Sequence, residues 1–425
     1  MGSKYPPSMR GCLPLWTLLL VVAFIVIFFF FTSYDTSSQD PKELTDTYRV
    51  LQDVTIMMAL GFGFINSSLR RYGWSSMAFN LFLLALTVQW AVLLNGFLEQ
   101  LSPQKVVIKL SSIKLATMSA MSVLISAGAV LGKANLVQLV LMALVEVTAF
   151  GVMRMIQAKY FVKDDHVNMM HIHVFAAYFG LMVAWSFRRP LHGRMMEKYQ
   201  TEKRSSLFGM LGTLFLWIFW PSFNSALLPN ERKNAMFNTY YALAVSTVTA
   251  ISVSSLAHPQ GKINMHHIHN AVLAGGVAVG TSCYLIRSPW LAMVLGLVAG
   301  LISTGGALSL TMRFNNMLDL HDTSGVYYTF GLPGLLGEIA HIVLITLQDD
   351  WTKSTRVEYQ LLLDIGALSL ALAMGLIIGL LTVSSSGCWI LSKSIREREV
   401  LSEVETASFH CCLFLMTHTL YSEVS

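Results

Sequence analysis

The sequence contains little charge for its length. Only 12% of its 425 residues are Asp, Glu, Lys or Arg, whereas soluble domains carry about 25%. The net charge of +5 is small and spread along the chain, and no basic patch with interleaved aromatic residues occurs. These shortages argue against a soluble domain and against nucleic acid as a partner.

Cysteine is also scarce, and several processing signals are missing. The five cysteines have neither the spacing of a disulfide framework nor that of a metal site. Cys12, beside an expected helix end, is a candidate for reversible lipidation, with an inert thiol as the alternative. The first apolar run lacks the cleavage site of a signal peptide, and Pro6 replaces the Ser or Thr of a myristoylation signal. That run is therefore predicted to span the membrane.

Long apolar runs are what the sequence has in abundance. Hydrophobic residues make up 54% of the chain, and a helix needs about 20 apolar residues to cross ~30 Å of hydrocarbon. The sequence predicts an all-α polytopic membrane protein with about twelve spans. They are 12–34, 50–69, 74–98, 110–132, 134–153, 169–187, 206–228, 236–256, 265–286, 288–310, 325–347 and 359–383.

Basic residues beside these spans predict their orientation. The loop of residues 188–204 alone contains six Lys or Arg residues. Because basic short loops stay in the cytoplasm, this bias predicts that both termini are cytoplasmic. Lys114 is the one basic residue inside a predicted span. Glycines four residues apart, such as Gly276 and Gly280, predict close packing of the helices in a bundle.

Two segments begin in the same way. Asp165 precedes His173 by eight residues in DHVNMMHIHVFAAYFG, and Asp322 precedes Phe330 by eight in HDTSGVYYTFGLPG. The two segments are the sixth and eleventh spans, so an odd number of crossings separates them and they enter the membrane from opposite faces. This arrangement is typical of an inverted-topology repeat.

Each of these residues has two interpretations. An aspartate at a helix start can simply accept hydrogen bonds from the free N–H groups of the first turn. His173 lies within a span, where ionisable groups are costly and mark cavities or pathways, or else bond to a nearby backbone carbonyl. A neutral imidazole both donates and accepts, so it can pass a small polar molecule along a line of hydrogen bonds.

Other polar groups within the spans are expected to be structural. Glu146, Glu338, His341 and Asp364 are predicted to be buried against hydroxyls or backbone of neighbouring helices, with a place along a pathway as the alternative. Three histidines lie close together at the start of one span, at positions 266, 267 and 269. Because no carboxylate or thiolate lies near them, we predict no metal site, and nothing in the sequence calls for a cofactor.

At these residues the chain resembles the ammonium transporter and Rhesus (Amt/Rh/MEP) family, and within it the Rh blood group polypeptides. The resemblance covers residues 1 to about 382 and rests on long stretches. These include CLPLW, RRYGWSSMAFNLFLLAL, FWPSFNSAL, FNTYYA, SSLAHPQGK, AVLAGGVAVGTSC and SPWLAMVLGLVAGLIS. It implies a trimer of bundles, each with two inverted five-helix halves and one extra N-terminal helix.

The resemblance also implies which residues would line a pore. Conducting members carry two pore histidines, each eight residues after an aspartate, and His173 stands in the first position whereas Phe330 replaces the second. A pair of phenylalanines guards the outer mouth of such channels; Phe223 matches one of them, and Met118 replaces the other. The chain thus retains one of two histidines and one of two phenylalanines.

The resemblance ends near the C-terminus. Residues 1–382 are predicted to form the transmembrane domain, and residues 383–425 an atypical cytoplasmic tail, whose apolar run CCLFLM is too short to span a bilayer. A different last exon and a gene-model error both explain such an abrupt change.

Three functions follow as expectations. The first is a non-enzymatic subunit of a trimeric complex in the erythrocyte plasma membrane, homo- or hetero-oligomeric. The Rh-associated glycoprotein, other erythrocyte membrane proteins and membrane lipid would be its partners, and its own conduction would be impaired. The second is a channel for ammonia, ammonium or carbon dioxide, motivated by His173, Asp165 and Phe223. The third, a secondary transporter for another small solute, rests on the inverted repeat alone.

Overall fold

The structure, a computed structural model, consists almost entirely of helices. It describes residues 12–37, 40–67, 73–99, 105–131, 133–134, 136–186, 203–228, 232–310, 320, 322–348 and 354–384. The helices are α2 (Cys12–Phe31), α3 (Pro41–Ile56), η1 (Met57–Gly61), α4 (Phe62–Asn66), α5 (Gly73–Glu99), α6 (Leu110–Val130), α7 (Leu136–Tyr160), α8 (Asp165–Met170), α9 (Ile172–Ser186), α11 (Lys203–Asn224), α12 (Arg232–Ala257), α13 (Met265–Ala278), α14 (Pro289–Gly305), η3 (Gly306–Leu310), η4 (Tyr327–Gly331), α16 (Leu332–Gln348) and α17 (Ser354–Ser384). Two short parallel strands, β1 (Thr32–Tyr34) and β2 (Val106–Ile108), pair with Thr32 opposite Val106.

The predicted membrane helices are confirmed. Eleven helical segments of the described residues are long and apolar enough to cross a bilayer. The remaining expected span, 265–286, is shorter than predicted, because α13 ends at Ala278 and turns follow over residues 279–285. Its apolar part, Ile268–Ala278, is too short to cross on its own.

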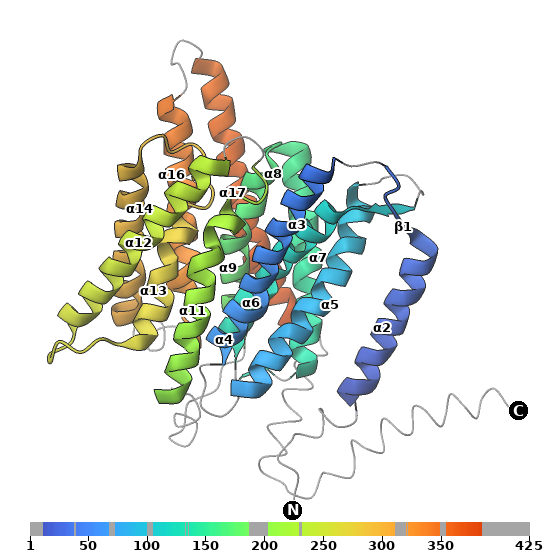
Figure 1. Ribbon diagram of the computed structural model, residues 1–425, viewed down its shortest axis with the longest axis horizontal. Coiled ribbons are helices and arrows are strands. Elements are labelled where there is room, and N and C mark those ends of the chain that lie inside the picture. The colour runs from blue at the N-terminus through green and yellow to red at the C-terminus, as the bar shows by residue number, and fades with distance from the viewer. Residues whose placement is uncertain are drawn as a thin grey trace, which may run out of the picture.

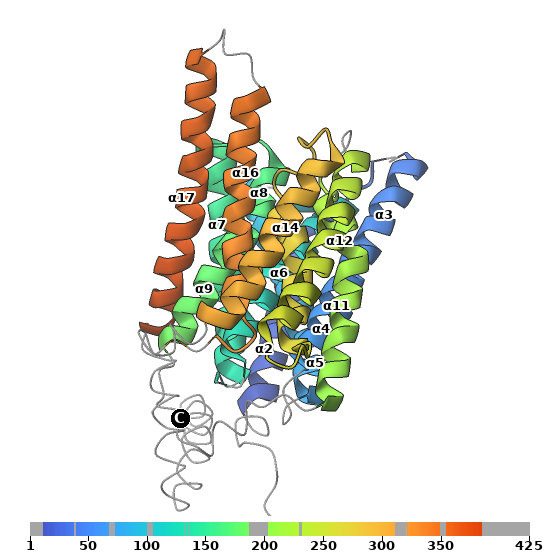
Figure 2. The ribbon, with the colours of Figure 1, turned by 90° about the vertical axis from the view of Figure 1, so that its left-hand side faces the viewer.

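The helices form one bundle, with α2 at its edge (Figures 1 and 2). This helix packs on α5, where the rings of Phe24 and Trp90 are stacked with centroids 5.9 Å apart. The Cys12 end of α2 and the Ser384 end of α17 lie on the same side of the bundle. A chain that crosses the membrane an even number of times has its two ends on the same side, as these two helix ends are.

The two segments with matching sequence run in opposite directions. The helix pair α8–α9 starts at the upper side of the bundle, whereas α16 ends at that side (Figure 2). The expected inversion of the two halves is therefore present in the fold, and the first turns of these segments lie at opposite ends of the bundle.

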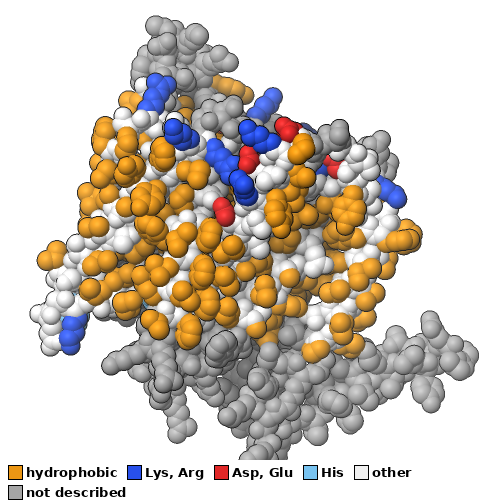
Figure 3. Space-filling view, viewed as in Figure 1, with side chains coloured by type: hydrophobic (Ala, Val, Ile, Leu, Met, Phe, Trp, Pro, Cys, Tyr) orange, Lys and Arg blue, Asp and Glu red, His pale blue; other side chains and the backbone are white. Residues whose placement is uncertain are grey.

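Burial divides the helices into central and peripheral ones. Within one apolar stretch of 18 residues in each helix, 89% of the residues are buried in Asp165–Ser186 and 83% in α6, but only 6% in α2. Figure 3 shows hydrophobic side chains over most of the visible face, with the visible charged side chains gathered mainly near its upper edge. An apolar exterior of this kind is suited to lipid rather than water.

Candidate functional site

The structure brings His173 and Phe330 together at the centre of the bundle. Their rings are parallel, with 6.3 Å between centroids and 5° between planes. The side chains are 1% and 6% exposed. The two residues that hold matching positions in the two halves therefore lie in contact, while their role in a pore remains a prediction.

Three further rings complete what we call the aromatic cluster: Phe62, His173, Trp220, Phe223 and Phe330. The ring centroid of Trp220 lies 6.1 Å from that of His173 and 6.4 Å from that of Phe330. The ring of Phe223 meets that of His173 edge-on, with 6.1 Å between centroids. Phe62 stacks on the far side of the cluster, 6.0 Å from Phe330. Offset stacking and edge-to-face contact are the favourable geometries for aromatic pairs, so the cluster is well packed.

Close approach of backbones positions these rings. At Gly276 of α13 a Cβ atom would lie 2.7 Å from Trp220 Cδ1, so only hydrogen fits there. The Asn224 side chain donates to the Gly276 carbonyl at 2.9 Å and to Thr239 Oγ1 at 3.1 Å, which fixes the end of α11 against α12 and α13. On the other side, Gly334 of α16 approaches the Cβ of His173.

Two π-helical turns, which the sequence did not predict, also shape the cluster. The segment η1 directly precedes Phe62, and η4 contains Phe330. A π-helical turn shifts the side chains that follow it around the helix axis, and such turns are frequent at functional sites. Gly325, with φ of +71°, leads into η4, and a side chain at that position would overlap the ring of Tyr328.

The hydrogen bonding of His173 defines what its ring can do. Its Nδ1–H donates to the Met170 carbonyl at 3.1 Å. In the neutral ring this bond leaves Nε2 as an acceptor. Nε2 is buried and has no partner among the described residues. It can therefore accept a hydrogen bond from a small N–H or O–H donor that reaches the cluster.

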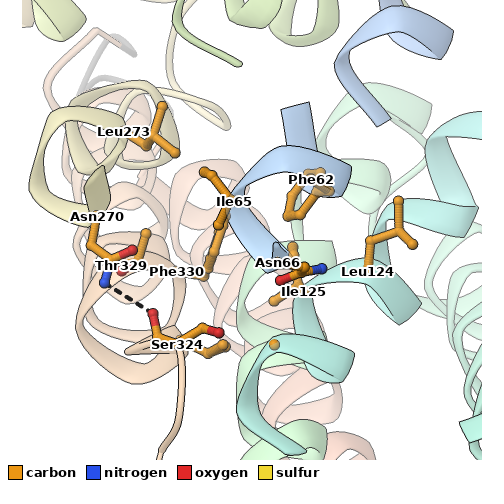
Figure 4. A pocket seen from close by; sticks show the side chains of 12 residues that line it. Phe62, Ile65, Asn66, Leu124, Ile125, Asn270, Leu273, Ser324, Thr329 and Phe330 are labelled. Atoms are coloured by element: carbon orange, nitrogen blue, oxygen red, sulfur yellow. Dashed lines mark hydrogen bonds between the residues drawn. The ribbon is translucent and has the colours of Figure 1, made fainter. Parts of the chain in front are cut away.

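A small cavity lies beyond Phe330 (Figure 4). The cavity has a volume of about 20 Å³, which is enough for about one water-sized molecule. Phe62 and Phe330 form part of its wall, while Asn270 donates to the Ser324 carbonyl at 2.9 Å on its polar side. His173 does not line the cavity, whereas Phe330, whose ring is parallel to that of His173, does.

The two expected helix-start aspartates differ. Asp322 accepts a hydrogen bond from the Tyr327 N–H at 2.8 Å, as predicted. Burial raises the pKa of Asp322 above its ordinary range, and backbone N–H groups oppose that shift. Asp165, however, does not cap its helix. It is exposed, and the neighbouring Asp164 accepts from the His166 N–H at 2.8 Å. The helix cap predicted at Asp165 is therefore corrected to Asp164. The Asp164 carboxylate also accepts from the Tyr284 hydroxyl at 3.1 Å.

Met118 and Cys12 are the remaining predicted site residues, and Met118 belongs to the same hydrophobic core as Phe223 and Phe330. Met118 of α6 is fully buried, one turn from Lys114, whose Nζ donates to the Ala226 carbonyl at 2.8 Å. Cys12 is the first residue of α2, and its side chain lies outside the described residues.

Two of the buried carboxylates, Glu146 and Glu338, meet hydroxyl groups, as expected. Ser126 donates to Glu146. Thr281 donates to Glu338 Oε1 at 2.6 Å, and Nε2 of His171 lies 3.4 Å from the other oxygen of Glu338. Both oxygens of Glu338 therefore have a partner, whereas the second oxygen of Glu146 has none among the described residues.

Metal ligation has no support in the described part of the chain, where no three His, Cys, Asp or Glu side chains are arranged to hold an ion. The side chains of His266 and His267 lie outside that part. Asp364 was predicted to lie against a hydroxyl or backbone group of a neighbouring helix, but it instead accepts from the amide of Gln360 on its own helix at 3.0 Å.

Comparison with known proteins agrees with this geometry. The model of the Ammonium Transporter Family matches residues 17–403. An RH-like protein of Macaca mulatta is 64% identical over 384 residues, which are 90% of this chain and 92% of that protein. The blood group Rh(CE) and Rh(D) polypeptides of Homo sapiens are each 62% identical over the same shares.

Solved structures show the same fold. A structure described as Nitrosomonas europaea Rh50 and the mechanism of conduction by the Rhesus protein family of channels is 29% identical. It matches 82% of this chain and 90% of its own, with a TM-score of 0.70. A structure described as a sensor Amt protein, 16% identical, matches 85% and 98% with a TM-score of 0.65. The chain therefore belongs to the ammonium transporter family, in the branch of the Rh blood group and RH-like proteins.

Proposed function

We propose that the protein is a non-enzymatic Rh-type membrane subunit that serves in assembly and whose own ammonia conduction is impaired. The observation that carries this proposal is the position of Phe330. Its ring, at the position where the family resemblance places the second pore histidine, is parallel to His173 and forms part of the cavity wall, which His173 does not line.

The chemistry of that ring supports impaired passage. Phenylalanine has no donor or acceptor for ammonia or water, so a solute in contact with it loses hydrogen bonds worth about 1–3 kcal/mol each. Each ~1.4 kcal/mol added to a barrier slows passage about tenfold. Loss of one relay group therefore corresponds to a reduction of about ten- to a hundredfold. The neighbouring rings, all less than a tenth exposed, add steric resistance.

Four residues would then stand where the family resemblance places them. His173 would be the remaining relay histidine, with Phe223 and Met118 at the outer mouth. Asp322 would hold the start of the second pore segment. Asp165, being exposed, would contribute charge near the outer surface rather than a helix cap.

Assembly is the second part of the proposal. We infer a trimer, with the Rh-associated glycoprotein and other erythrocyte proteins as partners in the plasma membrane and with both termini cytoplasmic. The blood group names of the relatives support that location. The shared side of the α2 start and the α17 end supports termini in one compartment. Large apolar side chains exposed on the bundle, Trp16, Phe29 and Trp290 among them, offer surface for lipid and for neighbouring subunits.

A conducting channel is the second candidate function. It is favoured by the unpartnered Nε2 of His173 and by a cavity of the right size for one small molecule. Carbon dioxide needs no hydrogen-bond partner, so a passage lined by aromatic rings would oppose it less than it opposes ammonia.

Flux measurements separate these functions. Liposomes containing this protein alone would be exposed to ammonia, methylammonium and carbon dioxide, with empty liposomes and the Nitrosomonas europaea Rh50 channel as controls. We expect ammonia flux close to that of empty liposomes. Flux equal to that of Rh50 would overturn the assembly proposal. The mass of the detergent-solubilised complex, with and without the Rh-associated glycoprotein, tests the trimer and its composition.

A further inference from the structure

Helix α13 ends inside the bundle, and the segment that follows it is buried although it is not helical. The turns over residues 279–285 contain Thr281, Ser282 and Cys283, and none of these three residues is more than 3% exposed. Irregular backbone at membrane depth occurs where it is enclosed by protein or lines a water-filled cavity. In transporters, the C-terminal ends of interrupted helices and the carbonyls of the turns after them bind cations and protons. The buried end of α13 has the same architecture.

Two imidazoles bind to the backbone at this end of α13. Nε2 of His166, on α8, lies 3.0 Å from the Gly280 carbonyl oxygen and 3.7 Å from Sγ of Cys283. His341, on α16, hydrogen-bonds to the backbone of Thr281. Because a carbonyl can only accept, Nε2 of a neutral His166 ring carries the proton and Nδ1 is left as an acceptor. In both rings Nδ1 is buried and has no partner among the described residues.

A third imidazole faces a carboxylate in the same place. Nε2 of His171, between α8 and α9, lies 3.4 Å from Oε2 of Glu338 on α16, and Thr281 donates to the other oxygen of Glu338. His171 is 1% exposed and Glu338 is 3% exposed. His341 is close enough to His166 and to His171 for electrostatic interaction. We call these five residues, which come from α8, the turn after α13 and α16, the α13-end cluster.

The charge of the pair His171 and Glu338 determines what it binds. A carboxylate beside a neutral imidazole leaves one negative charge in apolar surroundings, and such a charge is costly at membrane depth. One additional proton makes the pair neutral, whichever of the two groups carries it. Nδ1 of His171 is also buried without a partner among the described residues, so it can exchange a proton with a small molecule that reaches the cluster.

Acidic groups surround the cluster and connect it to the surface. Asp364, on α17, is close enough to Glu338 for electrostatic interaction, and its Oδ2 is buried with no partner in the described part of the chain. The ring centroid of Tyr284 lies 6.2 Å from that of His341, and the Tyr284 hydroxyl donates to the partly exposed Asp164. Negative groups around a poorly solvated site favour a positive charge within it.

We propose that the α13-end cluster is a buried proton-binding site, in which His171 and Glu338 share one proton that exchanges with water. No member of this cluster belongs to the aromatic cluster. The site is therefore independent of whether Phe330 closes the passage.

Infrared spectroscopy of the full chain in lipid nanodiscs at neutral pH tests the proposal, because a protonated carboxyl has a carbonyl band that a carboxylate lacks. The band of Glu338 is the one that Glu338→Gln removes, both from the parent and from His171→Leu. In His171→Leu the carboxyl holds the proton alone, so we expect its band to be about twofold stronger than in the parent, or more. In D2O the band should shift, because its proton exchanges. Glu146→Gln, at the buried carboxyl that meets Ser126, is the control and should leave the Glu338 band unchanged.

Two kinds of result would overturn the proposal. If His171→Leu has no Glu338 band, the carboxylate binds no proton there, and if its band equals that of the parent, the proton is not shared with His171. A band that stays in place in D2O would show that the proton does not exchange with water. If His171→Leu does not elute as a folded complex, His171→Gln should give the same increase, since glutamine keeps an N–H donor for Glu338 but has no basic nitrogen.

Discussion

Replacing Phe330 by histidine should raise the ammonia permeability of this protein by about ten- to a hundredfold. The site is prepared for the change: Asp322 holds the start of the segment, and Gly334 lets α16 approach His173. The ring at position 330 already lies parallel to His173 at 6.3 Å. A second ring with hydrogen-bonding nitrogens is what the position lacks.

The magnitude follows from the contacts. A solute that passes Phe330 has no partner on that ring, and one restored hydrogen bond is worth about 1–3 kcal/mol in a buried site. At ~1.4 kcal/mol per factor of ten, the expected gain is about one to two orders of magnitude. Phe62 and Trp220 remain packed against position 330, so we expect less conduction than a channel with two histidines and two mouth phenylalanines.

The assay is ammonia flux into liposomes at equal protein content, with size-exclusion elution as the check on folding. Phe330→Leu is the matched control, because leucine also removes the aromatic ring but supplies no nitrogen. We expect Phe330→Leu to conduct far less than Phe330→His. Equal flux in the two variants would show that bulk alone closed the passage. A folded Phe330→His protein no more permeable than the parent would refute the relay reasoning, because the site would then be closed elsewhere.

Three further changes test other parts of the structure. Met118→Phe alone should change ammonia flux little, since it restores a ring at the mouth and not the missing relay group, and the same liposome assay checks this. Gly276→Ala should destabilise the protein by about 1–3 kcal/mol, because the new Cβ would displace the indole of Trp220. Gly305→Ala, with nothing within 4 Å, is its control and should be neutral in thermal unfolding. Asp164→Ala should cost about 1–2 kcal/mol through loss of the helix cap, and Asp165→Ala clearly less; the opposite order in thermal unfolding would contradict the cap assignment.

The membrane spans and the matching positions of His173 and Phe330 could be predicted from the sequence because each leaves a simple pattern in it. Apolar length marks a membrane helix, and the repeated spacing from aspartate to a ring eight residues later placed His173 and Phe330 in matching positions. Their contact followed from the inversion of the two halves and needed no knowledge of side-chain packing.

Trp220 was not identified as part of the site, although it lies within a stretch that carried the family resemblance. A tryptophan in a span faces lipid as readily as it faces the core, and the sequence around it does not decide between them. What decides is Gly276, on another helix, whose lack of a side chain leaves room for the indole. The π-helical turns were missed for a similar reason, since a shift in the backbone hydrogen-bond ladder leaves no mark in composition.

The choice between Asp164 and Asp165 illustrates the same limit at the scale of one residue. Two adjacent aspartates at a helix start are equally good caps by propensity. The partner that selects Asp164 is the hydroxyl of Tyr284, which lies 120 positions along the chain. Spacing to His173 favoured Asp165, but a long-range hydrogen bond determined which carboxylate turns inward.

The second half of the bundle also shows that the residues which hold the helices in place differ from the residue that would pass a solute along. Asp322 accepts from the backbone at the start of its segment, and that bond is the same whichever ring follows eight residues later. Likewise, the backbone approach at Gly334 depends on the absence of its own side chain and not on a nitrogen at position 330. A histidine could therefore be exchanged for phenylalanine in this half with little effect on the helix start or the packing of α16. The elements that build the bundle and the group that would relay a solute are physically independent, so a protein of this family can retain its fold and its surfaces for partners while its conduction is reduced.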